Sequence, residues 1–268
     1  MFVPEHLLRL SCFLGTETDD GKISFRGSGI LLKHENLESA KLTAFVITAK
    51  HVVDKIFDHG CQWVVCQVNA GCDSSTLIRL PKESWRYHPN SGQVDVAVCP
   101  VQWDHTKIRD TGYLLNEQEM VLHRFGLGEE ILVIGLFSHL ANRAIAVARV
   151  GNLAALRTTK IPTNLFGPID AYLIELHSIG GLSGSPVFAR IQYSIPESQE
   201  RIENPEKLDD PYFMMIGIIH GHFDVDEDLQ EPAKHSSKVN VNTGMAAVIP
   251  SNLIRETLDH AIGNRRPL

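Results

Sequence analysis

One stretch of the sequence has the residues and the spacing of a serine nucleophile presented on a tight turn. In Gly181–Pro186, Ser183 stands between two glycines, and a proline and an apolar segment follow. Glycine lets the backbone turn without a Cβ in the way, so that backbone N–H groups can lie beside the serine hydroxyl. A protonated serine is a weak nucleophile, and this one would need a base.

A candidate base and a candidate carboxylate precede the turn in the chain. His51 follows the apolar and β-branched Phe45–Thr48, and Asp95 comes directly before the apolar Val96–Val98. A neutral imidazole can take the hydroxyl proton, and a buried carboxylate can fix its tautomer and stabilise its charge. A histidine in an apolar segment can also be purely structural, and an aspartate before a strand can cap a turn. The order His, Asp, Ser, one of those found in Ser-His-Asp hydrolases, favours the catalytic interpretation.

Six short motifs follow one another along most of the chain. They are Gly27–Leu32, Thr48–Val53, Asp95–Val98, Gly181–Pro186, Gly217–Ile219 and Gly244–Pro250. In this order they resemble the trypsin/chymotrypsin-like serine peptidases, and within that family the bacterial Deg-like branch that lacks disulfides. The resemblance implies an all-β fold of two antiparallel six-stranded β-barrels with a C-terminal helix. It also implies a serine endopeptidase that acts through an acyl-enzyme and needs no cofactor.

The resemblance assigns roles to particular residues. His51 would be the base, Asp95 its orienting carboxylate and Ser183 the nucleophile, while the N–H groups of Gly181 and Ser183 would form the oxyanion hole. The walls of the substrate pocket would come from His177, His220, Gly221, His222 and Met245.

The three pocket histidines suggest a preference for Glu, Gln or a small polar residue before the scissile bond. Imidazoles can donate hydrogen bonds to a carboxylate or an amide, and glutamate-specific members of the family use histidine in this way. The pocket base has no aspartate, which disfavours cleavage after Lys or Arg. The alternative is that these histidines only cap strand ends.

One departure from the family concerns control of activity. Digestive members have an aspartate just before the nucleophile that binds a newly made N-terminal amine, whereas this chain has Leu182. We therefore expect activation without N-terminal cleavage, with regulated, limited proteolysis as the role. The competing interpretation is a chymotrypsin-fold binding module, or a latent protease that is silent until a partner orders its loops. An α/β-hydrolase is disfavoured because that fold needs alternating helices and the order Ser, Asp, His.

Many short apolar and β-branched segments would position these residues. The predicted strands are Leu7–Gly15, Ile23–Lys33, Lys41–Thr48, Trp63–Val68, Leu77–Leu80, Val94–Val101, Ile131–Phe137, Ala144–Val150, Ala171–Leu176, Pro186–Ile191, Phe213–His220 and Met245–Ile249. A linker at Asp104–Gly128 separates the two sets. Residues 1–268 are predicted to form a single peptidase domain, with one barrel in residues 1–115, a second in 116–250, and a helix and tail in 251–268.

Helices and long loops are few. A short helix is predicted at Val53–Phe57, and a longer one begins at Ser251 as N-cap, with an apolar face that includes Ile254 and Leu258. Two charged loops are predicted, at Tyr193–Pro211 and Phe223–Thr243. In this fold they would lie near the substrate cleft, where an activating partner could bind.

Composition excludes several other classes of function. The chain of 268 residues is 43% hydrophobic, which is ordinary for a globular protein, and its net charge of −7 argues against a nucleic-acid partner. No apolar run approaches the ~18 residues of a membrane helix, and Met1–His6 lacks the basic start and apolar stretch of a secretory signal, so we expect none. With five cysteines in no disulfide pattern, we expect a cytoplasmic protein. Cys61, Cys66 and Cys72 are spaced too widely for a usual zinc knuckle, so we expect no metal.

Overall fold

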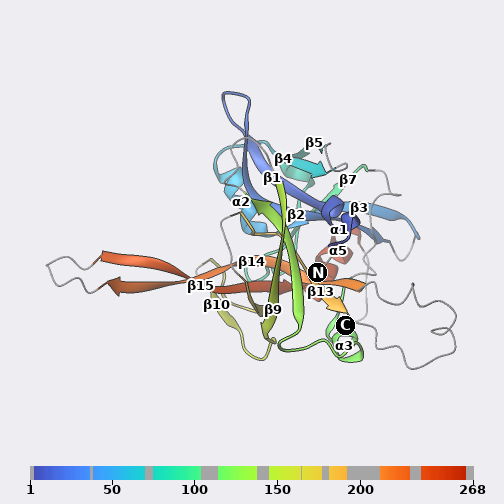
Figure 1. The fold of residues 1–268 in the computed structure, drawn as a ribbon. Helices are drawn as coiled ribbons and strands as arrows, with labels where there is room; N and C mark the ends of the chain where they lie inside the picture. Colours follow the sequence, from blue (N-terminus) through green and yellow to red (C-terminus); the bar gives the residue numbers. More distant parts are fainter. Residues whose placement is uncertain are drawn as a thin grey trace.

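Seven strands of the first half form one antiparallel sheet in a computed structural model (Figure 1). The structure describes residues 3–36, 39–69, 75–103, 114–137, 145–163, 165–176, 181–191, 212–229 and 237–263. The sheet order is β5-β4-β1-β2-β3-β7-β6. Its strands are β1 (Ser11–Glu17), β2 (Ile23–Glu35), β3 (Leu42–Thr48), β4 (Trp63–Asn69), β5 (Ser75–Pro81), β6 (Arg86–Tyr87) and β7 (Ala97–Val101).

The second half forms a closed barrel in the order β12-β15-β14-β13-β8-β9. The barrel strands are β8 (Glu130–Phe137), β9 (Ile145–Ala155), β12 (Tyr172–Glu175), β13 (Pro186–Ile191), β14 (Tyr212–Leu229) and β15 (Ser237–Pro250). A small hairpin of β10 (Ile161–Thr163) and β11 (Gly167–Ile169) precedes β12. The predicted all-β class with a C-terminal helix is confirmed.

The helices differ in part from the prediction. They are α1 (Glu5–Leu10), α2 (Lys50–Asp58), a 3₁₀ turn η1 (Lys82–Ser84), α3 (Glu117–Leu122) and α5 (Ser251–Ile262). The strand predicted from Leu7 begins only at Ser11, because Leu7 and Leu10 lie one turn apart on the buried side of α1. Within the predicted linker, Asn116 and Glu119 form a reciprocal capping box that starts α3.

The C-terminal helix α5 ties the two halves together. Its Ile254 and Leu258 are fully buried in a core cluster that includes residues of both sheets. The buried pair His34 and Asp259, 2.7 Å apart, joins α5 to β2, and the Asn36 side chain donates to the Ile262 carbonyl. The prediction that Ser251 is the N-cap of α5 is wrong. Pro250 holds that position, and the Ser251 hydroxyl donates to the Leu115 carbonyl.

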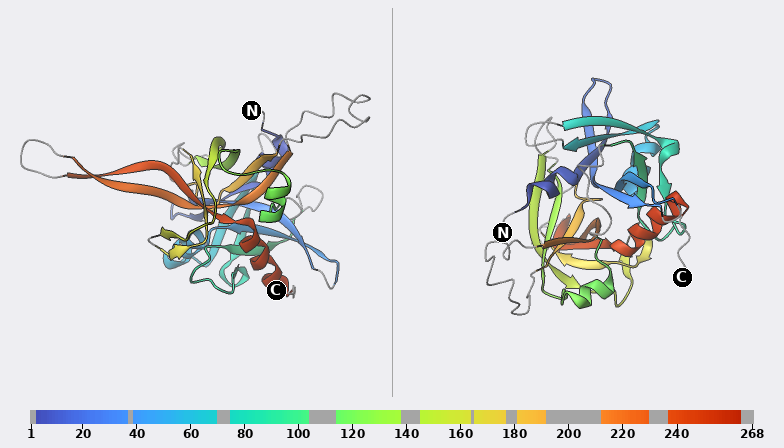
Figure 2. Two further views of the ribbon diagram at one scale, coloured as in Figure 1. Left: turned by 90° about the horizontal axis from the view of Figure 1, so that it is seen from below. Right: turned by 90° about the vertical axis from the view of Figure 1, so that its right-hand side faces the viewer.

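The predicted loop Phe223–Thr243 is wrong over most of its length. Strands β14 and β15 continue past the barrel with paired residues from Asp224↔Asn242 to Leu229↔Ser237. Figure 2 shows this two-stranded ribbon standing away from the rest of the molecule. The segment is rich in charged and polar residues, but Val225, Val239 and Val241 alternate with them, and this period-2 strand signal was not used. The other predicted loop, Tyr193–Pro211, lies outside the described residues.

No helix in the described ranges has both the length and the apolar character needed to span a membrane.

Candidate active site

Two neighbouring strands bring His51 and Asp95 to the same end of the first sheet. Strands β3 and β7 pair with Thr48 opposite Ala97, so the residues just beyond these ends meet. His51 lies in the first turn of α2, and its Nδ1 is 2.7 Å from Asp95 Oδ2. The backbone N–H of His51 donates to the other carboxylate oxygen, Oδ1, at 2.9 Å. Both carboxylate oxygens are therefore used by one residue.

The carboxylate of Asp95 is fully buried and remains ionised. Burial alone would raise its pKa, but hydrogen bonds from His220 and His51 hold the pKa well below its ordinary value. An ionised carboxylate only accepts hydrogen bonds, so His51 Nδ1 must carry the hydrogen. This tautomer leaves His51 Nε2 with a free lone pair, as a general base requires.

A second imidazole shares the same carboxylate oxygen. The Nδ1 atom of His220, in β14, is 2.5 Å from Asp95 Oδ2. The two imidazole rings meet edge to face, with centroids 5.5 Å apart and planes at 76°. The His220 ring thus lies in the His–Asp cluster, and its predicted role in the substrate pocket stays a prediction. Phe166, beyond β10, packs edge to face on the His220 ring at 5.7 Å.

Hydrogen bonds to the first sheet hold the turn that carries Ser183. The Ser28 N–H donates to the Ser183 carbonyl at 2.8 Å, and the Ser28 hydroxyl donates to the Gly181 carbonyl at 3.0 Å. The same hydroxyl accepts from the Leu136 N–H at 2.9 Å. Gly184 has φ +81°, and a Cβ there would overlap with the Ser28 carbonyl oxygen. Glycine is required because the backbone is left-handed and no room exists for a side chain.

The Ser183 hydroxyl points to a backbone carbonyl. Its Oγ donates to the His220 carbonyl at 3.2 Å. Among the residues that the structure describes, no hydrogen bond joins Ser183 Oγ to His51. His51 and Asp95 of the predicted triad are thus hydrogen-bonded to each other, while the Ser183 hydroxyl donates to the His220 carbonyl and not to His51.

Two backbone N–H groups of the turn are free to bind an anion. Within the described ranges, the N–H groups of Gly181 and Ser183 have no hydrogen-bond partner. Other N–H groups of the turn are used: that of Gly184 donates to Ile219, and that of Ser185 to Leu182. The free groups are the pair predicted for an oxyanion hole, and this role stays a prediction.

Leu182 and Ser185 anchor the turn in the second barrel. The Leu182 side chain is buried in the barrel core, and a Cβ on Gly135 would overlap with both Leu182 and Ser185. The Ser185 hydroxyl is fully buried and has no hydrogen-bond partner within the described part of the chain. An apolar contact thus occupies the position where the digestive enzymes have an aspartate.

The other residues predicted for the substrate pocket are only partly placed. His177 lies outside the described residues. Gly221 and His222 follow His220 in β14, opposite Ala247 and Ala246 of β15. Met245 starts that part of β15 and pairs with Glu175 of β12. Their role as pocket walls stays a prediction.

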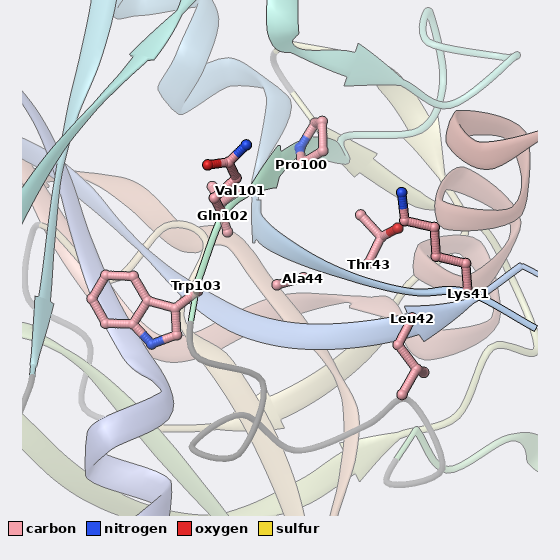
Figure 3. A pocket seen from close by; sticks show the side chains of 8 residues that line it. All are labelled: Lys41, Leu42, Thr43, Ala44, Pro100, Val101, Gln102 and Trp103. Carbon is pink, nitrogen blue, oxygen red and sulfur yellow. The ribbon is translucent and has the colours of Figure 1, made fainter.

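A surface pocket of 420 Å³ lies elsewhere, on the first sheet (Figure 3). It is formed at the start of β3 and the end of β7, whereas His51 and Asp95 lie at the opposite ends of these strands. It is therefore separate from the His–Asp cluster. The lining residues are Lys41, Leu42, Thr43, Ala44, Pro100, Val101, Gln102 and Trp103.

The cysteines that the structure describes are free thiols. Cys12, Cys66 and Cys99 are buried, and Cys61 is half-buried. Cys72 lies outside the described residues, so the set weighed as a zinc knuckle is not tested. A different set of possible metal ligands occurs in the described part of the chain: ligand atoms of His51, Asp95 and His220 lie within 4.8 Å of one another.

Sequence reasoning missed the contact of His220 with Asp95 and the role of Ser28. His220 ends the apolar run Phe213–Ile219, and a buried histidine there needs a polar partner, which was a usable signal. Ser28 lies in the motif Gly27–Leu32, but its contacts could not be inferred, because its partners Gly181 and Leu136 are over 100 residues away in the chain.

Comparisons with known proteins identify the fold. At the level of sequence, no family model and no curated protein matches the chain. The crystal structure of Deg5 is similar with a TM-score of 0.52 and 14% identity, over 95% of this chain and 89% of that chain. The Rv3671c protease from M. tuberculosis, in its active form, is similar with a TM-score of 0.52 and 15% identity, over 98% and 84%. Identities this low establish the fold alone, and that fold is the chymotrypsin-like one.

Proposed function

We propose that the chain is a serine endopeptidase that uses Ser183, His51 and Asp95. The observation that carries this proposal is the buried His51–Asp95 hydrogen bond beside a serine turn that is clamped by Ser28. An ion pair alone would be a weak argument, because buried histidine–carboxylate pairs also serve structure, as His34 and Asp259 do here. The added serine turn, with two free N–H groups, distinguishes this site.

The proposed reaction begins with a rotation of Ser183. The hydroxyl leaves the His220 carbonyl and donates to His51 Nε2, which takes the proton as Oγ attacks the substrate carbonyl. The Gly181 and Ser183 N–H groups stabilise the oxyanion. The imidazolium, held by Asp95, protonates the leaving amine, and water then hydrolyses the acyl-enzyme with His51 again as base.

Labelling with a fluorophosphonate tests this proposal. The wild-type protein should form a covalent adduct at Ser183, and Ser183→Ala should not. Mapping the adduct to another serine would contradict the assignment. A peptide-library digest then tests the preference for Glu, Gln or small polar residues, which dominant cleavage after Lys or Arg would exclude.

A latent protease is the second candidate, and the orientation of Ser183 favours it specifically. The hydroxyl donates to the His220 carbonyl instead of to His51. If a partner protein must shift the turn, the isolated chain will form the Ser183 adduct slowly, and the chain with its partner will form it faster. Rapid labelling of the isolated chain would instead contradict latency, and labelling without precursor trimming is what Leu182 leads us to expect.

A further inference from the structure

We propose that His51, Asp95 and His220 form a binding site for a zinc-type divalent cation, and that this cation inhibits the enzyme. The binding is a property of the three side chains, whereas the inhibition rests on the proposed function. The sequence suggested no metal, and the cysteines weighed for one are a different set.

The donor atoms are of the kind that zinc prefers. The site offers two imidazole nitrogens and one carboxylate oxygen, the set found in zinc sites that keep a fourth position for water. His51 Nδ1 and His220 Nδ1 lie 2.7 and 2.5 Å from the same oxygen, Asp95 Oδ2. Three donors from α2, the segment before β7, and β14 therefore converge on one point.

The ring geometry suits a shared ion. The imidazole planes meet at 76°, so the rings do not stack and both Nδ1 atoms face the carboxylate. Bonds of about 2.0 Å in a tetrahedral site place neighbouring donor atoms about 3.3 Å apart. The present separations must therefore widen by roughly 0.6–0.8 Å, a change that small side-chain rotations can supply.

Support around the carboxylate is already in place. Asp95 Oδ1 accepts the His51 backbone N–H at 2.9 Å, which fixes the carboxylate and leaves Oδ2 for the ligand. Metal-binding carboxylates in proteins are commonly held by such outer hydrogen bonds. The buried negative charge favours a cation. The nearby Lys50 ammonium is offset by Asp54, with which it pairs at 2.5 Å.

Metal binding and general-base catalysis exclude each other at this site. Each imidazole donates from Nδ1 to Asp95 Oδ2 and so has a hydrogen there. To bind the ion through Nδ1, it must move that hydrogen to Nε2, with no net release of protons. His51 Nε2 then has no lone pair for the Ser183 proton, and the nucleophile stays inactive.

The test uses the full chain with Ser183→Ala, so that binding is measured without turnover. Titration with Co²⁺ should give one equivalent of bound ion with the visible absorption of a four-coordinate site, and Zn²⁺ should displace it. Adding His220→Asn should weaken binding by more than about 100-fold, because the loss of a ligand costs more than the loss of an outer-shell partner, which is about 10–100-fold. Asparagine can still donate to Asp95, so this variant keeps the carboxylate satisfied. The matched control His222→Asn changes the histidine two residues along the same strand and should bind as before.

Two results would overturn metal binding at this site. One is that no Co²⁺ binds, and the other is that the His220 and His222 variants lose the same Co²⁺ affinity. Wild-type labelling separates this inference from the proposed function. If the adduct at Ser183 forms but saturating Zn²⁺ does not slow it, the inhibitory site is wrong and the peptidase stands. If Co²⁺ binds through His220 but no adduct forms in metal-free protein, the metal site stands and the peptidase fails.

Discussion

Gly184→Ala should both destabilise the protein and disable the serine turn. Gly184 has φ +81°, and a Cβ there would overlap with the Ser28 carbonyl oxygen and with Thr48 Oγ1. A left-handed alanine costs about 1–2 kcal/mol. Overpacking adds about 1–3 kcal/mol, because a backbone oxygen cannot rotate away. The expected loss in the free energy of unfolding is therefore about 2–5 kcal/mol.

A matched control separates the two contributions. Gly60 has φ +82°, and a Cβ there meets nothing within 4 Å. Gly60→Ala should therefore cost only the backbone part, about 1–2 kcal/mol. Urea unfolding measures both variants, and fluorophosphonate labelling of Ser183 measures the state of the turn. Gly184→Ala should label much more slowly than the wild type, whereas Gly60→Ala should label normally.

The reasoning fails if the two alanine variants lose the same stability, within about 0.5 kcal/mol, and label at the same rate. That result would mean that the turn moves away from the first sheet without cost. If the two variants are equally stable but only Gly184→Ala labels slowly, the substitution changes the geometry of the turn and not the stability beyond the backbone cost.

Three further predictions concern the cluster, a buried tyrosine and the thiols. Asp95→Asn should lower kcat by about 10⁴ on any cleaved peptide, because the amide no longer fixes the His51 tautomer; a fall of under tenfold in a folded variant would argue against the triad. Burial, followed by the Glu117 carboxylate, raises the pKa of Tyr172 to about 12. The unfolded chain, with a tyrosine pKa of about 10, loses this proton first, so stability falls as pH rises from 10 to 12, by about 1.4 kcal/mol at pH 11. Tyr172→Phe should lack this fall in urea titrations at pH 8 and 11, and parallel profiles for the two proteins would contradict the assignment. A thiol reagent should modify Cys61 in the native protein, and Cys61→Ser should remove this adduct. The buried thiols of Cys12, Cys66 and Cys99 should react only when the protein unfolds. Rapid modification of these three in the native protein would show that the core opens locally.

The sequence was sufficient for the motifs and their order, because each combines a local pattern with a chemical residue. The run before His51 and the glycines around Ser183 carry their own signals. The fold class followed from the same motifs and from the strand periodicity. The His220 contact could not be predicted as easily. A register shift between Ile219 and Gly221 changes the alternation of β14 at this residue, and its partner Asp95 is 125 residues away.

The sequence-based prediction also failed for the outer, mostly polar part of β14 and β15. The outer part of β14 and β15 is paired over Asp224–Leu229 but has a composition typical of loops. The alternation at Val225, Val239 and Val241 is short and lies among charged residues, so the loop prediction followed the composition instead.

Ser28 fixes the serine turn to the first sheet through hydrogen bonds. Three hydrogen bonds connect this β2 residue to the second half, at Gly181, Ser183 and Leu136. The two halves cannot swing apart like a hinge without releasing the nucleophile from its support. A substrate of the proposed peptidase would therefore have to bind while these hydrogen bonds stay in place. Loss of reactive serine should accordingly coincide with separation of the halves during unfolding, which makes the adduct at Ser183 a reporter of their association.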